Sequence, residues 1–263
     1  MDSIQYIIDN HCSVSRYGDG EFSVMWGGGN GFQSPNERLA KLLRKVIKAD
    51  DAPNHMIGIP IYIKDFSALR NPYSYWPLII SRNYYRLKEL LCLKRTYLNA
   101  SMTRFYYELQ DRSHSAEQIS LLRKIWENQD IVIVEGNQTR SGIGNDLYDN
   151  AKSVQRILGP ATNAIDKYDE MLEAITENVK KDKLILLSYG MAATVLAYDL
   201  AKLGYWAVDI GHVDLEYEWF KRKADDRIQV VGKFTNEVQG GGEKISECTN
   251  SEYLNQILLD ITK

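Results

Sequence analysis

The sequence has few cysteines and no long hydrophobic run. Its three cysteines, Cys12, Cys92 and Cys248, are odd in number and far apart. That pattern argues against a disulfide framework and against a clustered zinc site. Reduced thiols in a cytosolic protein are therefore the expected state. Nowhere do about 18 apolar residues run together, so we expect no membrane-spanning helix.

An excess of one sign of charge is also missing, because 32 Lys and Arg stand against 35 Asp and Glu, for a net charge of −3. This balance is too even for a generic nucleic-acid binder, so we expect no nucleic-acid partner. The stretch from Met1 to Cys12 lacks a basic region followed by an apolar one, so it does not resemble a secretory signal. We expect a cytoplasmic protein, and the sequence leaves its oligomeric state open.

Apolar and aromatic residues, by contrast, are abundant. Hydrophobic residues make up 44% of the chain and charged residues 25%, as is typical of a soluble globular protein. The chain is long enough for one large domain or two small ones, and we predict a single domain over residues 1–263. The 17 Tyr and 5 Trp fill cores but also stack on sugars and bases. We expect Trp26 and the segment Tyr73–Trp76 to form a platform for a sugar.

Short apolar runs alternate with amphipathic segments along the chain. Predicted strands cover residues 13–17, 56–59, 97–101, 130–134, 184–187, 206–210 and 233–238. Predicted helices cover residues 35–47, 115–126, 146–157, 166–179, 191–203 and 252–261. This alternation predicts an α/β fold with a Rossmann-like, mainly parallel sheet flanked by helices. Such sheets bind ligands beyond the carboxyl ends of their strands, so the loops at those ends are the places to look for chemistry.

The loop after the first predicted strand carries two carboxylates, Asp19 and Glu21, between glycines. In an extended backbone, side chains two residues apart leave on the same side. Two converging carboxylates can hold a hard divalent cation such as Mg²⁺ or Mn²⁺. Gly18 and Gly20 let the backbone approach a ligand, and Arg16 can clamp a phosphate. The alternative is an ordinary Gly-Asp-Gly turn followed by a solvated Glu.

Two further loops have the composition of anion-binding sites. The loop after the predicted strand 130–134 contains Arg140 and Ser141 among glycines and precedes a predicted helix, so it can cradle a phosphate. The turn Ser188-Tyr189-Gly190 lies between a strand and a helix, where backbone N–H groups face an anion and Tyr189 can stack on a base. The alternatives are a plain surface loop and a plain strand-to-helix turn.

His212 and Asp214 follow the last strand of the predicted βαβ unit. His212 is one of four histidines, and its place at the carboxyl end of a strand favours a role as general base, metal ligand or ribose contact. Asp214 or Glu216 can orient His212, and Asp214 can also act as the base itself. In the alternative, Asp214 caps the next helix and His212 packs on it. The segment 233–238 and the glycines after it can form a lid over the site, or a linker to the last helix.

Several of these segments together resemble the GT-D-type bacterial glycosyltransferases, a family long known as a domain of unknown function. The matching stretches are SRYGDGEF (Ser15–Phe22), GFQ (Gly31–Gln33), RSGIGNDLYDNAKSVQRIL (Arg140–Leu158), NAIDKYDE (Asn163–Glu170), ATVLAYDLAKLGYWAVDIGHVDLEYEWF (Ala193–Phe220) and KFTNEVQGG (Lys233–Gly241). The chain departs from the family pattern at Tyr17, where the pattern has Phe, and at the turn beginning at Ser188, where a Leu-Gly-Pro type turn is expected.

The resemblance implies a GT-D-type fold and a metal-dependent transfer of a sugar, with glucose from a UDP-sugar as the first choice. It also implies that Asp19 and Glu21 hold the metal and the donor diphosphate. Members of the family are linked to surface glycoproteins such as serine-rich adhesins, and to polysaccharides of Gram-positive bacteria. The acceptor is then an oligosaccharide or a glycoprotein.

Two other functions compete with this interpretation. One is a different nucleotide-binding α/β transferase, for example one that uses S-adenosylmethionine, and it predicts metal-independent ligand binding. The other is a glycan-binding module without catalysis, which is indifferent to UDP and Mn²⁺.

Overall fold

The computed structural model describes residues 1–65, 67–70, 75–92, 94–242 and 245–262, with the side chains of 75–77 left out. Within them the chain forms an eight-stranded sheet in the order β3-β2-β1-β7-β6-β4-β5-β8. Every neighbouring pair of strands in this sheet is parallel. The strands are β1 (Ser13–Arg16), β2 (His55–Ile59), β3 (Leu98–Asn99), β4 (Asp130–Gly136), β5 (Ser153–Gly159), β6 (Leu184–Ser188), β7 (Trp206–Asp209) and β8 (Ile257–Asp260).

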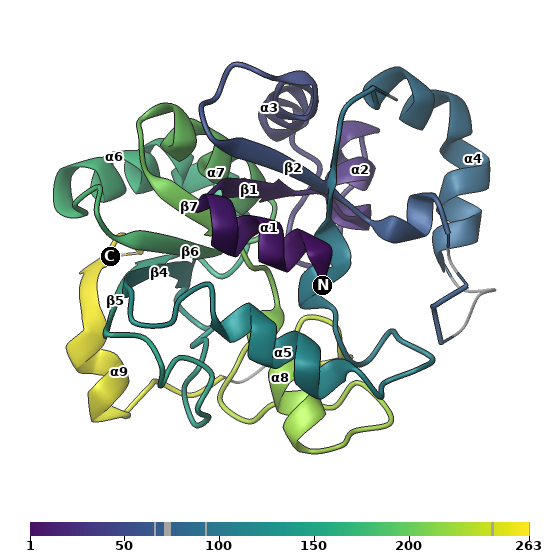
Figure 1. Cartoon of the computed structure of the whole chain (residues 1–263). Helices are drawn as coiled ribbons and strands as arrows, with labels where there is room; N and C mark the ends of the chain where they lie inside the picture. The colour runs from purple at the N-terminus through teal and green to yellow at the C-terminus, as the bar shows by residue number, and fades with distance from the viewer. Residues whose placement is uncertain (66, 71–74, 93, 243–244, 263) are drawn as a thin grey trace.

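Helices cover both faces of the sheet, as Figure 1 shows. They are α1 (Asp2–Asn10), α2 (Asp19–Met25), α3 (Glu37–Lys48), α4 (Tyr75–Leu90), α5 (Ser115–Arg123), α6 (Tyr168–Asn178), α7 (Ala192–Lys202), α8 (Val213–Lys221) and α9 (Ser251–Gln256). Three short 3₁₀ helices are η1 (Ile61–Ile63), η2 (Ala100–Thr103) and η3 (Ala164–Lys167). The structure thus confirms the predicted α/β fold with a parallel sheet.

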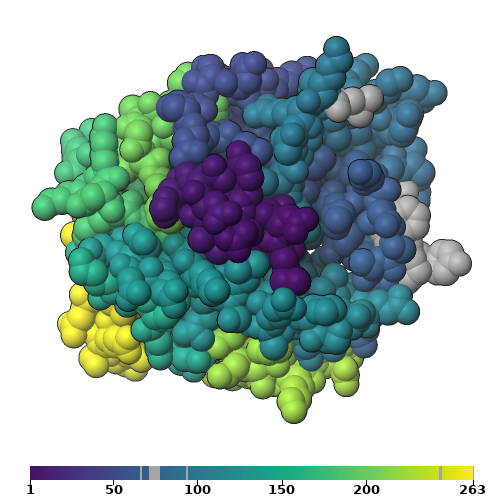
Figure 2. Space-filling model, in the orientation of Figure 1, coloured from purple at the N-terminus to yellow at the C-terminus, as the bar shows by residue number. Residues whose placement is uncertain are grey.

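Alternate residues of the central strands supply two separate cores, one on each face. In β4, Val132 and Val134 pack against the side that carries α2, α3, α6 and α7. Ile131 and Ile133 pack against the side that carries α1, α5 and α8. Figure 2 shows α1, in purple, lying in the middle of the visible face between the blue and teal parts of the chain. Strands covered on both faces read as continuous apolar runs, which is why β4 and β6 are recognisable in the sequence.

Three predicted elements are wrong. Residues 153–159 form β5 where a helix over 146–157 is predicted, and the residues before it form turns. The last predicted helix ends at Gln256, after which β8 pairs with β5. The predicted strand 233–238 is irregular. In β5, Arg156 faces a protein interior and forms a buried ion pair with Glu135, at 2.6 Å, so its polarity misleads a pattern-based prediction.

The topology places a crevice between β1 and β7. These strands are neighbours, yet the chain leaves β1 through α2 toward β2 and leaves β7 through α8 toward β8, at the opposite edge of the sheet. Connections that diverge from adjacent parallel strands open a crevice at the carboxyl ends of those strands. Among the described residues, no helix is long and apolar enough to cross a membrane.

The partly buried histidine at the start of β2 leads to a testable pH dependence. His55 Nε2 lies 2.8 Å from the hydroxyl of Ser15, and its ring packs on Tyr198. Burial, with a smaller contribution from Arg95, lowers the pKa of His55 from 6.5 to about 4. The folded protein therefore binds fewer protons than the unfolded chain between these values, and its stability falls as the pH drops from 6.5 to 4.

The size of this effect can be isolated with one variant. The shift corresponds to about 3 kcal/mol of unfolding free energy. Urea unfolding of wild type and of His55→Gln at several pH values measures it. We expect the wild type to lose about 3 kcal/mol more than the variant on going from neutral pH to pH 4. Parallel losses in both proteins would show that His55 is not kept neutral by the fold.

Candidate active site

A cleft of about 670 Å³ opens at the carboxyl ends of β1 and β7, within the usual size range of ligand pockets. The cleft is lined by many ionisable side chains, which are the candidates for binding and catalysis. These lining residues are Arg16, Asp19, Glu21, Arg70, Arg104, Glu108, Asp209, His212, Arg227 and Glu237. A narrower recess of about 40 Å³ adjoins the cleft and shares Phe32, Ser188, Gly190, Gly211, His212 and Asn236 with it. The two hollows thus form one continuous site.

The two predicted metal-binding carboxylates both line the cleft, but their backbone is not extended as predicted. Asp19 and Glu21 stand in the first turn of α2, because the carboxylate of Glu21 turns back and accepts a hydrogen bond of 2.6 Å from the backbone N–H of Gly18. Such a capping arrangement starts a helix and places both acids at its positive end.

Negative charge is concentrated at this helix start. Burial, together with the nearby charges of Asp209 and Asp19, raises the pKa of Glu21 to about 7. Burial also raises the pKa of Asp209, although Arg16 opposes it. Like charges held together out of water disfavour their own ionisation. The arrangement is therefore one that a cation would stabilise. Among the described residues, no group of three or more His, Cys, Asp or Glu side chains is placed to hold a metal by itself.

Arg16 is fixed at the floor of the cleft between three elements. Its guanidinium pairs with Asp209 at 3.4 Å, donates to the carbonyl of Ala100 at 2.7 Å and contacts the hydroxyl of Thr103. Gly211 makes this position possible, because a Cβ there would lie 2.0 Å from Arg16 Nη2, and its φ is +49°. Arg16 therefore lines the cleft, but its donors are largely engaged within the protein.

His212 stands at the N-terminus of α8 and lines both the cleft and the recess. Its Nδ1 lies 2.9 Å from Glu237 Oε1 and 3.3 Å from Arg104 Nη2. Nε2 has no hydrogen-bond partner among the residues that the structure describes. Burial raises the pKa of Glu237, but Arg104, His212 and Arg227 outweigh it and hold that pKa well below the usual range. Glu237 is thus an ionised carboxylate behind a histidine that faces the cleft.

Asp214 lines the recess, but both of its carboxylate oxygens are bound within the protein. Its Oδ1 accepts hydrogen bonds from the N–H of Gly142 at 2.8 Å and from the side chain of Asn145 at 2.9 Å. Its Oδ2 pairs with the buried Lys233 at 2.7 Å. Because both oxygens are engaged and the residue is only 3% exposed, the structure argues against the predicted role of Asp214 as a base. This pair instead anchors the loop that carries Glu237.

Arg140 and Ser141 likewise turn into the protein, and neither lines the cleft or the recess. Arg140 donates to the carbonyls of Gly232 and Ser246, at 2.8 and 2.6 Å. Ser141 donates its N–H to the buried Glu135 and shares a hydroxyl contact with Tyr148. Arg140 and Ser141 therefore fasten the C-terminal part of the chain, whereas Gly136 and Thr139 of the same loop line the recess.

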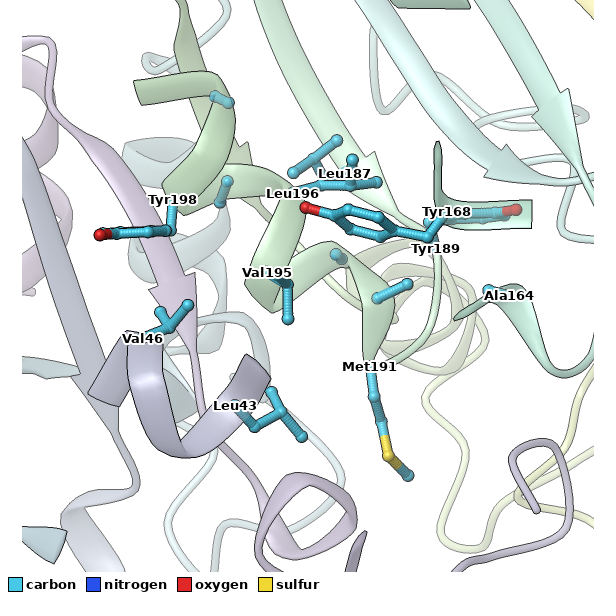
Figure 3. Close-up of a cluster of buried hydrophobic side chains, with 14 of the residues drawn as sticks. Leu43, Val46, Ala164, Tyr168, Leu187, Tyr189, Met191, Val195, Leu196 and Tyr198 are labelled. Atoms are coloured by element: carbon cyan, nitrogen blue, oxygen red, sulfur yellow. The ribbon is translucent and has the colours of Figure 1, made fainter. Parts of the chain in front are cut away.

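In the turn after β6, some residues line the site and another packs in the hydrophobic core. Ser188 and Gly190 line both hollows, and Ser188 donates to the carbonyl of Gly211 at 2.8 Å. Tyr189 contributes to the recess wall but is 1% exposed and lies among apolar side chains that include Leu187 and Leu196, as Figure 3 shows. Its ring is therefore part of the core and cannot stack on a base as predicted.

The predicted aromatic platform can be compared with the structure only at Trp26. Tyr73 lies outside the described residues, as do the side chains of Tyr75 and Trp76. Trp26 is stacked on Phe22 with 5.6 Å between ring centroids and is not among the residues that line the cleft. The aromatic rings in the lining belong to Tyr17, Phe32, Tyr62 and Tyr107.

Comparisons with known proteins agree with this architecture. A family model described as "Glycosyltransferase GT-D fold" matches residues 14–238. The chain is similar to "Glycosyltransferase GlyD" of Streptococcus pneumoniae, with 33% identity over 240 residues, covering 90% of this chain and 29% of that protein. It is also similar to "Probable glycosyl transferase Gly" of Streptococcus gordonii, with 34% identity over 242 residues, covering 89% of this chain and 34% of that protein. The chain thus spans about a third of the length of these curated relatives.

Solved structures show the same fold. One, described as "The highly conserved domain of unknown function 1792 has a distinct glycosyltransferase fold", superposes with a TM-score of 0.90 at 33% identity, covering 98% of this chain and 92% of that one. Another, "A New Glycosyltransferase (DUF1792) from Streptococcus sanguinis", gives a TM-score of 0.87 at 30% identity, covering 98% of this chain and 96% of that one.

Proposed function

The chain belongs to the glycosyltransferases of GT-D fold, and on that premise we propose that it transfers a sugar from a UDP-sugar to a glycan hydroxyl with the help of a divalent cation. The cation would be Mn²⁺ or Mg²⁺, held by Asp19 and Glu21. The observation that carries this proposal is the charge arrangement of the cleft, where crowded carboxylates face arginines that are already engaged.

Each arginine of the cleft has a partner within the protein. Arg16 pairs with Asp209. Arg104 pairs with Glu216 and Glu237, and Arg227 with Glu108 and Glu237. Arg70 is bound to the backbone carbonyl of Asp225. A diphosphate would therefore find few unshared positive charges among the described side chains. Two carboxylates suit Mg²⁺ or Mn²⁺ in this setting, because such ions usually complete their coordination with substrate phosphates and water.

The residues of the chain then divide the work as follows. Asp19 and Glu21 would hold the cation, which supplies positive charge against the departing diphosphate. The cleft of about 670 Å³ would take the nucleoside diphosphate, because the adjoining recess of about 40 Å³ is too small for a nucleoside. His212 would accept the proton of the acceptor hydroxyl through Nε2, because that nitrogen faces the cleft and has no protein partner among the described residues.

We further propose that glucose is the transferred sugar. The acceptor would be a glycan of a bacterial surface glycoprotein or polysaccharide. Both assignments are what the family resemblance noted in the sequence implies. The balanced charge and the isolated cysteines support a cytoplasmic location. The chain spans about a third of the length of its curated relatives. These assignments therefore concern only the reaction in the cleft of this chain, and not the activity of a whole relative.

A thermal-shift screen with UDP, GDP, NAD and S-adenosylmethionine, each with and without Mn²⁺, tests the donor and the metal together. A ligand at about a hundred times its dissociation constant adds about 2.7 kcal/mol of stability, which should raise the melting temperature by roughly 5–10 °C. We expect this rise for UDP only when Mn²⁺ is present.

Other patterns of stabilisation would favour the competing functions. A metal-independent rise with S-adenosylmethionine would point to a transferase of another type. Binding of glycans that ignores both UDP and Mn²⁺ would point to a module without catalysis. In both cases the proposed function would be wrong.

A further inference from the structure

The carboxylate of Glu237 is held in the cleft by three side chains. Its Oε1 lies 2.9 Å from His212 Nδ1 and 2.5 Å from Arg104 Nη2. Its Oε2 lies 3.0 Å from Arg227 Nε. The loop around it is fixed by the buried pair of Lys233 with Asp214. A fixed, ionised carboxylate therefore stands directly behind the imidazole ring.

These contacts decide which ring nitrogen of His212 carries the proton. An ionised carboxylate only accepts hydrogen bonds, so its 2.9 Å contact requires a proton on Nδ1. An arginine only donates, so the 3.3 Å contact of Arg104 with Nδ1 would be a hydrogen bond only without that proton. The contact with Glu237 is the shorter one, and Arg104 is already occupied by Glu237 and Glu216. The Nδ1–H form is therefore favoured.

We propose that Glu237 is a positioning residue that keeps His212 in the Nδ1–H tautomer and so presents the lone pair of Nε2 to the cleft. The carboxylate also orients the ring toward the hollows that His212 lines and stabilises the imidazolium that forms after proton uptake. In histidine, the hydrogen-bond partner of one ring nitrogen commonly determines which of the two nitrogens carries the proton. The catalytic consequence rests on the proposed function, whereas the tautomer does not.

The proton movement fits a single transfer step. The acceptor hydroxyl gives its proton to His212 Nε2 while its oxygen bonds to the anomeric carbon of the donor sugar. The bond between that carbon and the β-phosphate oxygen breaks, and its electron pair leaves with UDP. The imidazolium, held at Nδ1 by Glu237, then returns its proton to water.

Nitrogen-15 NMR of the histidine rings reads the tautomer directly and needs no substrate. The chain has four histidines, so the signals of His212 can be assigned by their loss in His212→Gln. At about pH 8.5, well above the ordinary histidine pKa, we expect a protonated Nδ1 and an unprotonated Nε2 in the wild type. In Glu237→Gln the neutral amide no longer favours Nδ1–H, and donation by Arg104 should shift the ring toward the Nε2–H form.

The exposed pair of His114 and Glu117, with 3.3 Å between Nδ1 and Oε2, provides a matched control. Glu117→Gln removes the same kind of carboxylate from a histidine outside the cleft, and it should leave the signals of His212 unchanged. Glu237→Asp keeps the charge, and it should retain the Nδ1–H form at least in part.

Kinetics with the sugar donor test the catalytic consequence. For Glu237→Gln we expect kcat to fall about 10²–10⁴-fold, the range that a misplaced proton on a general base produces. The KM for the donor and the affinity for UDP with Mn²⁺ should stay unchanged, and Glu237→Asp should recover part of kcat. A purely structural role of Glu237 would instead change KM and kcat together.

Two results would overturn the inference, and each is distinct from a failure of the proposed function. An Nε2–H or a doubly protonated His212 in the wild type would show that Glu237 does not set the tautomer, whatever the enzyme transfers. A shifted tautomer in Glu237→Gln with full kcat would show that the tautomer does not serve catalysis. Absence of metal-dependent UDP binding would contradict the proposed function and leave the NMR result standing.

Discussion

Replacing Asp19 by Asn is expected to abolish metal-stimulated sugar transfer and to lower kcat/KM about a thousandfold, equivalent to about 4 kcal/mol of transition-state stabilisation. Asp19 stands in the first turn of α2 and lines the cleft beside Glu21. Its amide analogue has nearly the same shape but no negative charge, so a divalent cation would lose one of two protein carboxylates. The measurement is UDP release from UDP-glucose at several Mn²⁺ concentrations.

A surface variant controls for the general effect of losing an aspartate. Asp169→Asn removes a carboxylate from α6 that is 74% exposed and paired with Arg38. It should retain wild-type activity and metal response. Equal melting temperatures of the two variants without ligand would show that Asp19→Asn leaves the fold intact. Full activity of the wild type in the presence of a chelator would refute the role of the metal.

Replacing His212 by Gln is expected to lower kcat about 10²–10⁴-fold, the usual contribution of a general base. The reason is that Nε2 is the ring nitrogen that faces the cleft without a protein partner among the described residues, and glutamine offers no basic nitrogen in its place. Donor binding should persist, because the carboxylates of α2 are untouched. Steady-state kinetics, with calorimetric titration of UDP and Mn²⁺, separates the two effects.

The exposed His114 supplies the comparison for this variant. Its side chain is 72% exposed, so His114→Gln should leave both kcat and KM at wild-type values. If His212→Gln weakens UDP binding in proportion to its loss of kcat/KM, His212 is a binding residue and the proton is taken by another group.

The central strands could be predicted because the pattern that identifies them lies within each strand's own sequence. Strands β4, β6 and β7 are apolar and buried on both faces, so their sequences are continuous hydrophobic runs. Helix α7 could be predicted in the same way, because most of its residues are apolar and buried. Strands β5 and β8 were missed because their pairing depends on partners far along the chain. In β5, the buried partner of Arg156 lies 21 residues away, which no local pattern reveals.

The position of the site could be predicted because it lies at the carboxyl ends of strands, which the sequence identifies. Asp19, Glu21 and His212 follow β1 and β7, and the structure brings all three to one cleft. Arg140 and Asp214 stand in the expected loops, but they turn inward to bind Gly232 and Lys233, and composition does not tell which way a polar side chain points.

Three residues that matter for the site were missed. Glu237 and Arg104 come from irregular segments whose position is set by tertiary contacts such as their mutual ion pair. Asp209 could have been found, since it is the last residue of β7 and therefore stands at the carboxyl end of a strand.

Calorimetric titration of UDP into the wild-type protein, with Mn²⁺ and then with a chelator, tests the central claim most directly. We expect saturable binding with Mn²⁺, no measurable binding after chelation, and no binding by Asp19→Asn under either condition. UDP binding of equal affinity in the chelator, or unchanged binding by Asp19→Asn, would contradict a metal site at the start of α2.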